Sequence, residues 1–408
     1  MNVGFIGLGK AGLPIAIAFE KAGHTTFGYD RRAADRTAEF YREDEYDENG
    51  ELLWKYYESE SKVEFLSFHE TIVKADFLFV LVGTPSAEPG IGEDTRISCP
   101  YDMSKIDTIL ESLETIKYDK PVVVASTCTP GYLSQKQKLV SYPIVHVPQF
   151  CAMGSAVRDT LDPEFVIIGY EERNCNAARE IHNFYSSFLG PNVPVIPMNL
   201  TEAELTKTTY NGTVMWKINY VNSIARLCDE IGGADVDVIT KALAKSYRRI
   251  FAPTYWRAGG GDGGPCHPKE NAMLSWLSRG ANPWSDNMFQ RYQYAQWLAN
   301  KVLSMYEDHI DRHDKDLPIY IVGKGFKAES PIPDHGFPLL MKEFLPEAIF
   351  YDKVTGDTPG LFKGVYLIAM NHSFVKHMIF PPGSIIIDPW GMIDNPPENV
   401  VYYPVGRR

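Results

Sequence analysis

A glycine-rich turn near the N-terminus constrains the fold more than any other part of the sequence. An apolar run, Val3 to Ile6, leads directly into Gly7-Leu8-Gly9-Lys10-Ala11-Gly12, and a helical stretch rich in Ala and Ile follows to about Ala22. A second apolar run, Thr25 to Tyr29, ends at Asp30. This order of strand, turn, helix, strand and acid is typical of a dinucleotide-binding domain. We therefore expect a parallel sheet with helices on both faces at this end of the chain.

The residues of this turn have separate tasks in the predicted site. Gly7 makes the tight turn, Gly9 lets the backbone approach a pyrophosphate, and Gly12 permits close packing of the helix on the strand. The N-terminus of the helix attracts the phosphates. Asp30 accepts hydrogen bonds from the ribose hydroxyls and would repel a 2'-phosphate, so we expect NAD rather than NADP. The two arginines that follow Asp30 weaken this preference.

Further strand-like runs extend the first α/β domain to about residue 200. They lie at 77–82, 122–125, 144–147 and 166–169, and a helical stretch follows near 174–189. The first two of these runs are followed by Thr84 and Thr127. Because ligands of open α/β sheets bind beyond the carboxyl ends of strands, we expect both hydroxyls to contact a ligand. Threonines at such places also form turns, which is the alternative interpretation.

A long helix is expected to open the second domain. We interpret Thr201 as its N-cap and Glu204 as the N3 partner of a capping box. Apolar residues then keep helical spacing until Gly232-Gly233 ends the pattern. Lys207 and Asn211 lie four residues apart on or beside the apolar face. A lysine is rarely buried without a task, although one near a helix start can also extend its amine to solvent.

The stretch 259–270 combines flexible backbone with a cysteine. It reads Gly259-Gly260-Gly261-Asp262-Gly263-Gly264-Pro265-Cys266-His267-Pro268-Lys269-Glu270. Glycines let a backbone approach a ligand closely, and neighbouring positive charge lowers the pKa of a thiol. Cys266 is therefore a candidate thiolate nucleophile. The alternative is a surface loop around a buried structural cysteine.

A second strand-and-turn pattern begins the last part of the chain, at Pro318 to Lys327. Strand-like runs near 348–351, 365–369 and 384–388 follow it, so residues 311–408 are expected to form another α/β domain. We predict three domains with bounds 1–200, 201–310 and 311–408.

Composition and charge narrow the classes of partner. The net charge is −12 and no lysine- or arginine-rich run is present, which argues against nucleic acid and anionic membranes. Six cysteines without CxxC spacing argue against a metal site or a disulfide framework and for reduced thiols in a cytoplasm. The chain starts with a strand-like run instead of a leader, and its longest apolar run, 77–82, is too short to cross a bilayer. We expect a cytoplasmic protein.

These motifs, in this order, resemble the UDP-glucose/GDP-mannose dehydrogenase family of nucleotide-sugar dehydrogenases. The markers are Gly12-Leu13-Pro14, Thr84-Pro85, Ser126-Thr127 with Pro130-Gly131, Pro148 and Phe150 with Ala156 and Asp159, the helix with Lys207 and Asn211, the Cys266 loop, and Gly323 with Phe326 and Lys327. The resemblance implies two Rossmann-like doubly wound domains, joined by a central helical domain with one long helix. It also implies NAD as cofactor, a UDP-sugar as substrate and a homodimer built on the central helix.

The resemblance also implies a reaction. Members of the family oxidise the primary alcohol of the sugar to a carboxylate with two NAD and one water. Cys266 would attack the intermediate aldehyde, Lys207 and Asn211 would hold the oxyanion, and Thr127 and Glu270 would order the water. The cofactor-binding residues implied are Gly7, Gly9, Gly12, Asp30, Thr84, Thr127 and Lys269. The substrate-binding residues implied are Phe150, Lys207, Asn211, Arg249, Arg257, Gly263, Phe326 and Lys327.

The chain departs from the family pattern at several of these positions. Gln149 stands where the family has a glutamate that acts as base towards the hydrolytic water, and an amide cannot take a proton. Glu270 replaces an aspartate, Asp334 falls where a cofactor-binding arginine is usual, and Trp390 lies where a late arginine follows aspartate. UDP-glucose oxidation is the leading expectation. An enzyme arrested at the thioester, a two-electron β-hydroxyacid-type dehydrogenase and a nucleotide-sugar binding protein are the alternatives.

Overall fold

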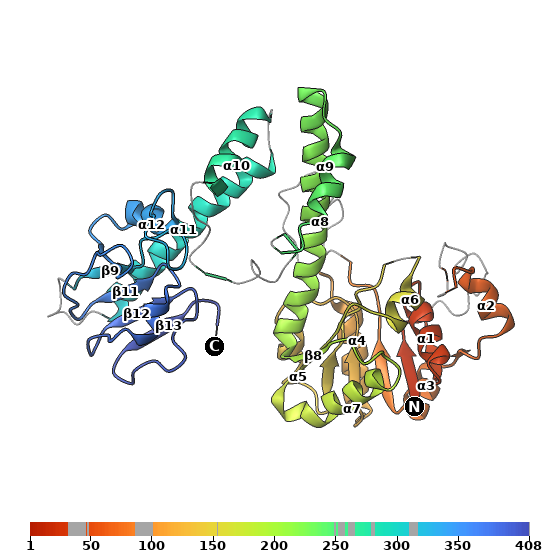
Figure 1. Cartoon of the computed structure of the whole chain (residues 1–408). Helices are drawn as coiled ribbons and strands as arrows, with labels where there is room; N and C mark the ends of the chain where they lie inside the picture. The colour runs from red at the N-terminus through yellow and green to blue at the C-terminus, as the bar shows by residue number, and fades with distance from the viewer. Residues whose placement is uncertain are drawn as a thin grey trace. The chain divides into compact units, whose positions relative to one another are not determined.

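The protein, analysed as a computed structural model, contains two compact units, Met1–Met215 and Trp216–Arg408 (Figure 1). The structure describes all residues except 32–45, 47–48, 86–100, 153, 249, 252–257, 260–265, 279–281, 310–316 and 408. The boundary between the units falls inside the longest described helix, α8 (Leu200–Ile231). The three-domain division with bounds at 200 and 310 stays a prediction.

The first unit is built on a sheet whose strand order is that of a doubly wound fold. In its described residues the order is β3-β2-β1-β4-β5-β6-β7-β8. Neighbouring strands are parallel except β6 and β7, which pair antiparallel. The strands are β1 (Asn2–Ile6), β2 (Thr25–Tyr29), β3 (Glu64–Phe65), β4 (Phe77–Val80), β5 (Val122–Val124), β6 (Ile144–His146), β7 (Val166–Tyr170) and β8 (Val195–Met198). The order reverses between β1 and β4, and ligands of such sheets bind at this reversal.

Helices cover both faces of this sheet, because alternate residues of its strands pack into two different cores. Phe77 and Phe79 of β4 join the core beneath α1, α6 and α7, whereas Leu78 and Val80 join the core beneath α3, α4 and α5. The strands therefore have continuous apolar sequences. The helices are α1 (Gly12–Lys21), α2 (Leu53–Ser59), α3 (Phe68–Lys74), α4 (Ser104–Thr115), α5 (Tyr132–Gln137), α6 (Ala156–Leu161), η3 (Glu172–Asn174) and α7 (Cys175–Ser186).

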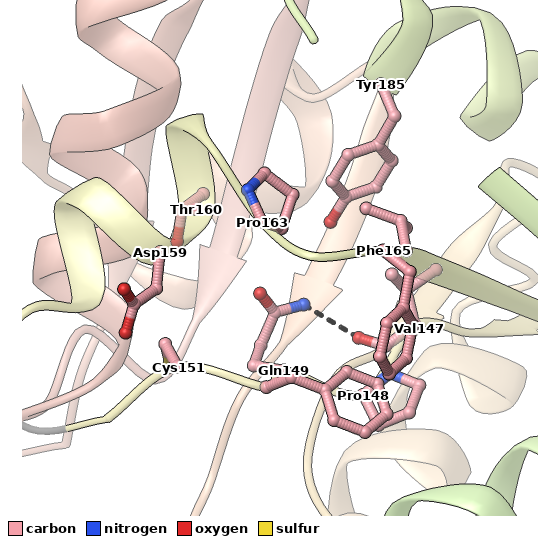
Figure 2. A pocket seen from close by; sticks show the side chains of 11 residues that line it. Val147, Pro148, Gln149, Cys151, Asp159, Thr160, Pro163, Phe165 and Tyr185 are labelled. Atoms are coloured by element: carbon pink, nitrogen blue, oxygen red, sulfur yellow. Dashed lines mark hydrogen bonds between the residues drawn. The ribbon is translucent and has the colours of Figure 1, made fainter. Parts of the chain in front are cut away.

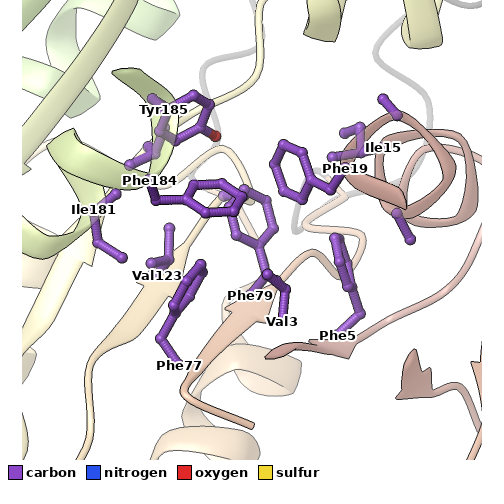
Figure 3. Packing of buried hydrophobic residues seen from close by; sticks show 14 of the residues in the cluster. Val3, Phe5, Ile15, Phe19, Phe77, Phe79, Val123, Ile181, Phe184 and Tyr185 are labelled. Atoms are coloured by element: carbon purple, nitrogen blue, oxygen red, sulfur yellow. The ribbon is translucent and has the colours of Figure 1, made fainter. Parts of the chain in front are cut away.

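Phenylalanine rings fill the centre of the first core (Figure 3). Phe19 of α1 meets Phe184 of α7 edge to face, with ring centroids 4.9 Å apart. It also meets Phe79 edge to face at 5.5 Å. Such edge-to-face pairs stabilise a core beyond the burial of their area. They fix α1, and with it the glycine-rich turn, on the sheet.

The second unit contains a smaller, wholly parallel sheet in its described residues. Its order is β10-β9-β11-β12-β13. The strands are β9 (Ile319–Val322), β10 (Ile349–Tyr351), β11 (Val365–Ile368), β12 (Ile385–Asp388) and β13 (Val401–Pro404). The helices are α9 (Val236–Leu243), α10 (Cys266–Leu277), α11 (Pro283–His309), α12 (Phe337–Phe344) and η5 (Ser373–His377). The order reverses between β9 and β11, as in the other common doubly wound arrangement.

The predicted fold class is confirmed, with one error at the start of α8. The capping box predicted from Thr201 to Glu204 is wrong by two residues. Asn199 Oδ1 instead accepts from the Glu202 N–H at 2.9 Å, and Glu202 accepts from the Asn199 N–H at 2.9 Å. Asparagine is as good an N-cap as threonine or better, so the helix begins earlier. This leaves the Glu204 side chain free for another partner.

Strands β8 and β13, at the sheet edge of each unit, were not expected from the sequence. Each contains a proline, Pro197 and Pro404, which lowers strand propensity and is tolerated only at an edge. None of the helices in the described part of the chain combines the length and the apolar character that a membrane crossing requires.

Candidate active site

The turn after β1 has no room for side chains at two of its glycines. Gly7 has φ +106°, and a Cβ built there would overlap the carbonyl oxygen of Leu81. A Cβ at Gly12 would overlap the carbonyl oxygen of Gly7. The turn therefore packs against the segment after β4, at the reversal of strand order. The Gly9 carbonyl accepts from Leu13 N–H at 3.0 Å and starts α1 above it.

Asp30 follows β2 at the same edge of the sheet and is half-buried. The register of β1 on β2 pairs Ile6 with Tyr29, so Asp30 lies next to the start of the glycine turn. This is the placement that ribose recognition requires. The residues present therefore fit a dinucleotide, although the binding roles of Gly7, Gly9, Gly12 and Asp30 remain predictions.

Thr84 and Thr127 join the ends of two neighbouring strands. Thr84 Oγ1 donates to the Thr127 carbonyl oxygen at 2.7 Å. The Thr84 hydroxyl thus uses its proton to stabilise the loop, as the turn-forming interpretation predicts. Its oxygen can still accept a hydrogen bond from a ligand. Ser126 ties the same loops together, because its hydroxyl accepts from Val82 N–H at 2.8 Å and donates to the Val82 carbonyl at 2.7 Å. Sequence reasoning did not assign a role to Ser126.

Lys207 is buried in the first unit, with 8% of its surface exposed. Its Nζ lies 3.4 Å from Asn211 Oδ1, and 4.9 Å from the centre of the Phe150 ring. The ring of Tyr210 is 5.9 Å away. Burial lowers the pKa of Lys207, and the nearby Cys151 offsets part of this effect. A lysine that extended its amine to solvent would be exposed, so that alternative does not describe Lys207 in this structure. The binding and catalytic roles of Lys207 and Asn211 stay predictions.

Glu204 is the residue of this region that sequence reasoning assigned wrongly. Its side chain is fully buried, and its carboxylate accepts from Gly131 N–H at 2.6 Å and Leu133 N–H at 2.8 Å. These donors belong to the first turn of α5 and to the residue before it, directly after the Thr127 loop. Glu204 thus ties the start of α8, one turn before Lys207, to that loop. Burial raises the pKa of Glu204, and the two N–H groups partly counteract this rise.

Gln149 lies in the loop after β6, at the wall of a small cavity (Figure 2). Its Nε2 donates to the Val147 carbonyl at 2.8 Å. This bond fixes which end of the amide faces the carbonyl, because a carbonyl oxygen only accepts. A glutamate in the same conformation would place a carboxylate oxygen against that carbonyl. The local structure is therefore suited to the amide that the chain carries.

The predicted residues around the cysteine belong to the second unit. Cys266 is the first residue of α10, and Lys269 and Glu270 are exposed near the start of this helix. Arg249, Arg257 and Gly263 lie outside the described residues. The structure therefore does not describe most of the predicted loop.

The described start of that loop is held by α11 and by the segments after β12 and β13 of the same unit. A Cβ built at Gly259 would overlap the indole of Trp390. Tyr294 Oη donates to the Gly259 carbonyl at 2.8 Å, and Arg407 donates to the Ala258 carbonyl at 3.1 Å. Trp390, which departs from the family pattern, thus contacts the backbone that leads to Cys266.

The loop between β9 and α12 differs in one respect from the first glycine turn. Gly323 has φ +90° and follows β9 as Gly7 follows β1. However, the Lys324 and Gly325 N–H groups donate to Asp352 Oδ2, at 2.7 and 3.3 Å. Asp352 follows β10 and is fully buried beside His372, 3.3 Å from its Nε2. Two amides of this turn are therefore already bound by the protein's own carboxylate.

Other predicted residues of this part of the chain are exposed or form hydrogen bonds with the backbone. Lys327 is exposed, with Nζ 5.5 Å from the centre of the Phe326 ring, and Asp334 is exposed. Asp388 is fully buried. It accepts from the N–H groups of Trp390, Met392 and Ile393 and from the Tyr402 hydroxyl. The Asp388 carboxylate therefore stabilises the conformation of the loop after β12.

Comparison with known proteins assigns the chain to a family. Residues 1–189 match the NAD binding domain of the UDP-glucose/GDP-mannose dehydrogenase family, and residues 201–288 match its central domain. The chain belongs to the UDP-glucose/GDP-mannose dehydrogenase family. The predicted family is thereby confirmed, and so is NAD as its cofactor, because the chain carries the NAD binding domain of the family.

Individual relatives match about two thirds of the chain. The UDP-glucose 6-dehydrogenase of Rickettsia conorii is 30% identical over 289 residues, which are 67% of this chain and 62% of that protein. UDP-glucose 6-dehydrogenase 5 of Oryza sativa subsp. japonica is 30% identical over 277 residues, 64% of this chain and 55% of that protein. An uncharacterized protein of Methanocaldococcus jannaschii is 31% identical over 276 residues, 66% of this chain and 30% of that protein. The chain thus spans less than two thirds of the length of these relatives.

A solved structure supports the fold over the whole chain. The GDP-mannose dehydrogenase of Pseudomonas aeruginosa superposes with a TM-score of 0.78 and covers 98% of this chain and 99% of that one, at 17% identity. At this identity the likeness concerns the fold. It extends the agreement beyond residue 288, to the C-terminal sheet.

Proposed function

We propose that the protein is an NAD-dependent dehydrogenase that oxidises a nucleotide sugar at its primary alcohol to the carboxylate. The observation that carries this proposal is the buried Lys207, paired with Asn211 on α8 within the central domain of a nucleotide-sugar dehydrogenase family. A buried ammonium and an amide can stabilise an oxyanion more strongly than they would in water. The fixed position of α8 on the Thr127 loop supports the same interpretation.

The residues of this chain would have separate roles in the two oxidation steps. The turn at Gly7 to Gly12 and Asp30 would hold the cofactor, which when bound supplies the hydride acceptor. Lys207 and Asn211 would donate to the sugar oxygen as it gains charge in each oxidation step. A Cys266 thiolate would add to the aldehyde carbon, because an aldehyde has no second hydride to give until a nucleophile adds.

Release of the product needs a water molecule. Addition of water to the thioester carbon would form the carboxylate, and the C–S bond would break with the sulfur of Cys266 leaving as thiolate. Thr127 and Glu270 are proposed to order this water. Gln149 can orient a water through its amide oxygen but cannot take a proton. We therefore expect hydrolysis to be slow relative to an enzyme with a carboxylate at this position.

UDP-glucose is the proposed substrate, supported by the names of the relatives from Rickettsia and rice. The test measures NADH formed from UDP-glucose, UDP-N-acetylhexosamines and GDP-mannose, with Cys266→Ser as the control. We expect two NADH for each UDP-glucose oxidised by the wild type and at most one with the control variant, which lacks the thiolate that the second oxidation needs. No NADH from any nucleotide sugar would refute the proposal, and one NADH per substrate would favour a two-electron dehydrogenase.

The second candidate is an enzyme that stops at the thioester, and Gln149 is the observation that favours it. Mass spectrometry of protein incubated with NAD and substrate would then show an adduct on Cys266. Gln149→Glu should remove the adduct and speed turnover. If the variant turns over at the wild-type rate and no adduct forms in either protein, hydrolysis is not limited by residue 149.

A homodimer through the central helix is proposed as well. Apolar side chains of α8 support it, since Val214, Met215 and Ile218 are 44%, 65% and 55% exposed. Light scattering of Met215→Glu protein should show monomers where the wild type shows dimers. The cytoplasmic location stays a prediction that rests on the scattered cysteines.

A further inference from the structure

A cavity lies behind the loop that carries Gln149 (Figure 2). Its volume is about 20 Å³, and a cavity of on the order of 10–15 Å³ can hold one water molecule. Val147, Pro148, Phe150, Pro163, Phe165 and Val166 supply apolar walls, and the polar lining includes Gln149, Thr160, Asp159 and Tyr185. The space is thus large enough for a water molecule, and it has polar groups on its walls.

The Tyr185 hydroxyl is the polar group that requires an explanation. Tyr185 lies on α7 with 2% of its surface exposed, and its O–H has no hydrogen-bond acceptor among the described residues. Figure 2 shows this hydroxyl pointing into the same space as the Gln149 side chain. Burial raises the pKa of Tyr185, and the Gln149 amide beside it offsets part of that rise. The hydroxyl is therefore protonated at neutral pH and able to donate.

The Gln149 carboxamide offers the matching acceptor. One Nε2–H is used by the Val147 carbonyl at 2.8 Å, so the amide orientation is fixed. The amide oxygen is then turned away from that carbonyl and towards the cavity, as Figure 2 shows. Buried polar groups in native proteins have partners, and ordered water is the usual partner where the protein supplies none.

We propose that this cavity binds one water molecule, which accepts from the Tyr185 hydroxyl and donates to the Gln149 amide oxygen. The resulting chain runs from Tyr185 through the water to Gln149 and on to the Val147 carbonyl, with each donor facing an acceptor. Its effect is to hold the Gln149 side chain in one conformation. Tyr185 is thus a positioning residue for Gln149.

One consequence rests on the proposed function. If Gln149 orients the hydrolytic water, loss of the Tyr185 hydroxyl should slow release of the carboxylate more than it changes the KM for the nucleotide sugar. The water site itself is tested without turnover, so a failure of the site and a failure of the proposed activity are distinguishable.

The decisive measurement is the sign of the change in thermal stability of the full chain on Tyr185→Phe. If a water satisfies the hydroxyl, the variant loses a hydrogen bond, and its unfolding midpoint falls by about 2–4 °C. If the cavity is dry, the substitution removes an unsatisfied buried polar group, and the midpoint stays the same or rises. The second result would overturn the proposal.

Tyr142→Phe is the matched control. Tyr142 is also buried, with 1% exposed, but its hydroxyl donates directly to the Leu110 carbonyl at 2.8 Å. Its loss must lower the midpoint whether or not the cavity is wet, which calibrates the assay. A crystal structure of the wild-type chain gives a second, independent readout. Density for a water within hydrogen-bond distance of Tyr185 Oη and Gln149 Oε1 is expected, and an empty cavity there would also overturn the proposal.

Discussion

Replacement of Glu204 tests the idea that one buried carboxylate connects α8 with the Thr127 loop. Glu204→Ala removes the acceptor of two charge-assisted bonds, from Gly131 N–H at 2.6 Å and Leu133 N–H at 2.8 Å. Each buried N–H left without a partner costs about 1–3 kcal/mol. The carboxylate itself is costly to bury, as its raised pKa indicates, and this offsets part of the loss. A net destabilisation of about 2–4 kcal/mol results.

Thermal unfolding measures this loss directly. For a unit of this size, about 1 kcal/mol shifts the midpoint by roughly 2–4 °C, so Glu204→Ala should lower it by about 4–16 °C. Glu204→Gln keeps one acceptor oxygen but turns an amide N–H₂ towards the second donor, so an intermediate decrease is expected. Turnover in the folded variants should fall more than affinity for NAD, because Thr127 and Lys207 lose their fixed separation.

Glu202→Gln is the control for these variants. Glu202 lies on the same turn of α8 but is exposed, and its carboxylate accepts from the N–H of the cap residue, Asn199, at the helix start. Its replacement should cost about 1 kcal/mol or less. The reasoning would be refuted if Glu204→Ala were no more destabilising than Glu202→Gln, or if its turnover matched the wild type.

Three further substitutions test other parts of the molecule. Lys207→Ala should reduce turnover by about 10²–10³-fold with NAD affinity unchanged, measured by NADH assay and fluorescence titration, and wild-type turnover would show that this lysine is only structural. Asp352→Asn should destabilise the protein by about 2 kcal/mol at neutral pH, because His372 and backbone N–H groups hold the pKa of Asp352 at about 2, against an unfolded value of 3.8. A carboxyl with a lowered pKa stabilises the fold at a pH above its unfolded pKa. The difference in free energy of unfolding between wild type and variant, measured by urea denaturation, should therefore shrink as the pH falls from about 4 to 2. A difference that stays constant over this range would contradict the prediction. Gly259→Ala should lower the unfolding midpoint, because the added methyl group would collide with Trp390. Adding Trp390→Ala to that variant should restore part of the lost midpoint. If the two substitutions change the midpoint by purely additive amounts, the contact is excluded.

Local sequence was sufficient to predict the parts of the molecule that depend on local physics. The turn from Gly7 to Gly12 is explained by backbone space alone, and Asp30 follows its strand at the expected position. Lys207 and Asn211 were found because a four-residue spacing places two side chains together on any helix. The predicted strands agree with the structure to within one or two residues, because a short continuous apolar run marks a strand that is buried on both faces.

The wrong and missing assignments have partners far away in the sequence. Glu204 was assigned to its own helix because a glutamate three residues after a threonine fits a capping box, yet its donors lie more than 70 residues earlier. Asn199 is the stronger local cap. Its presence was the one signal in the sequence that Glu204 is not needed for the capping box and can have another partner. Tyr185 had no local signal at all, since it reaches the cavity that Gln149 also lines only after the sheet has formed.

The packing of Gly259 on Trp390 has a consequence for how this chain can vary between species. No side chain at position 259 is compatible with an indole at position 390. A lineage that loses the tryptophan becomes free to change the glycine, whereas one that keeps it does not. In an alignment of near relatives the two positions should therefore covary, although 130 positions separate them. Gly259 and Trp390 thus form one inherited pair, and a search for orthologues with the same loop before Cys266 should require both residues together.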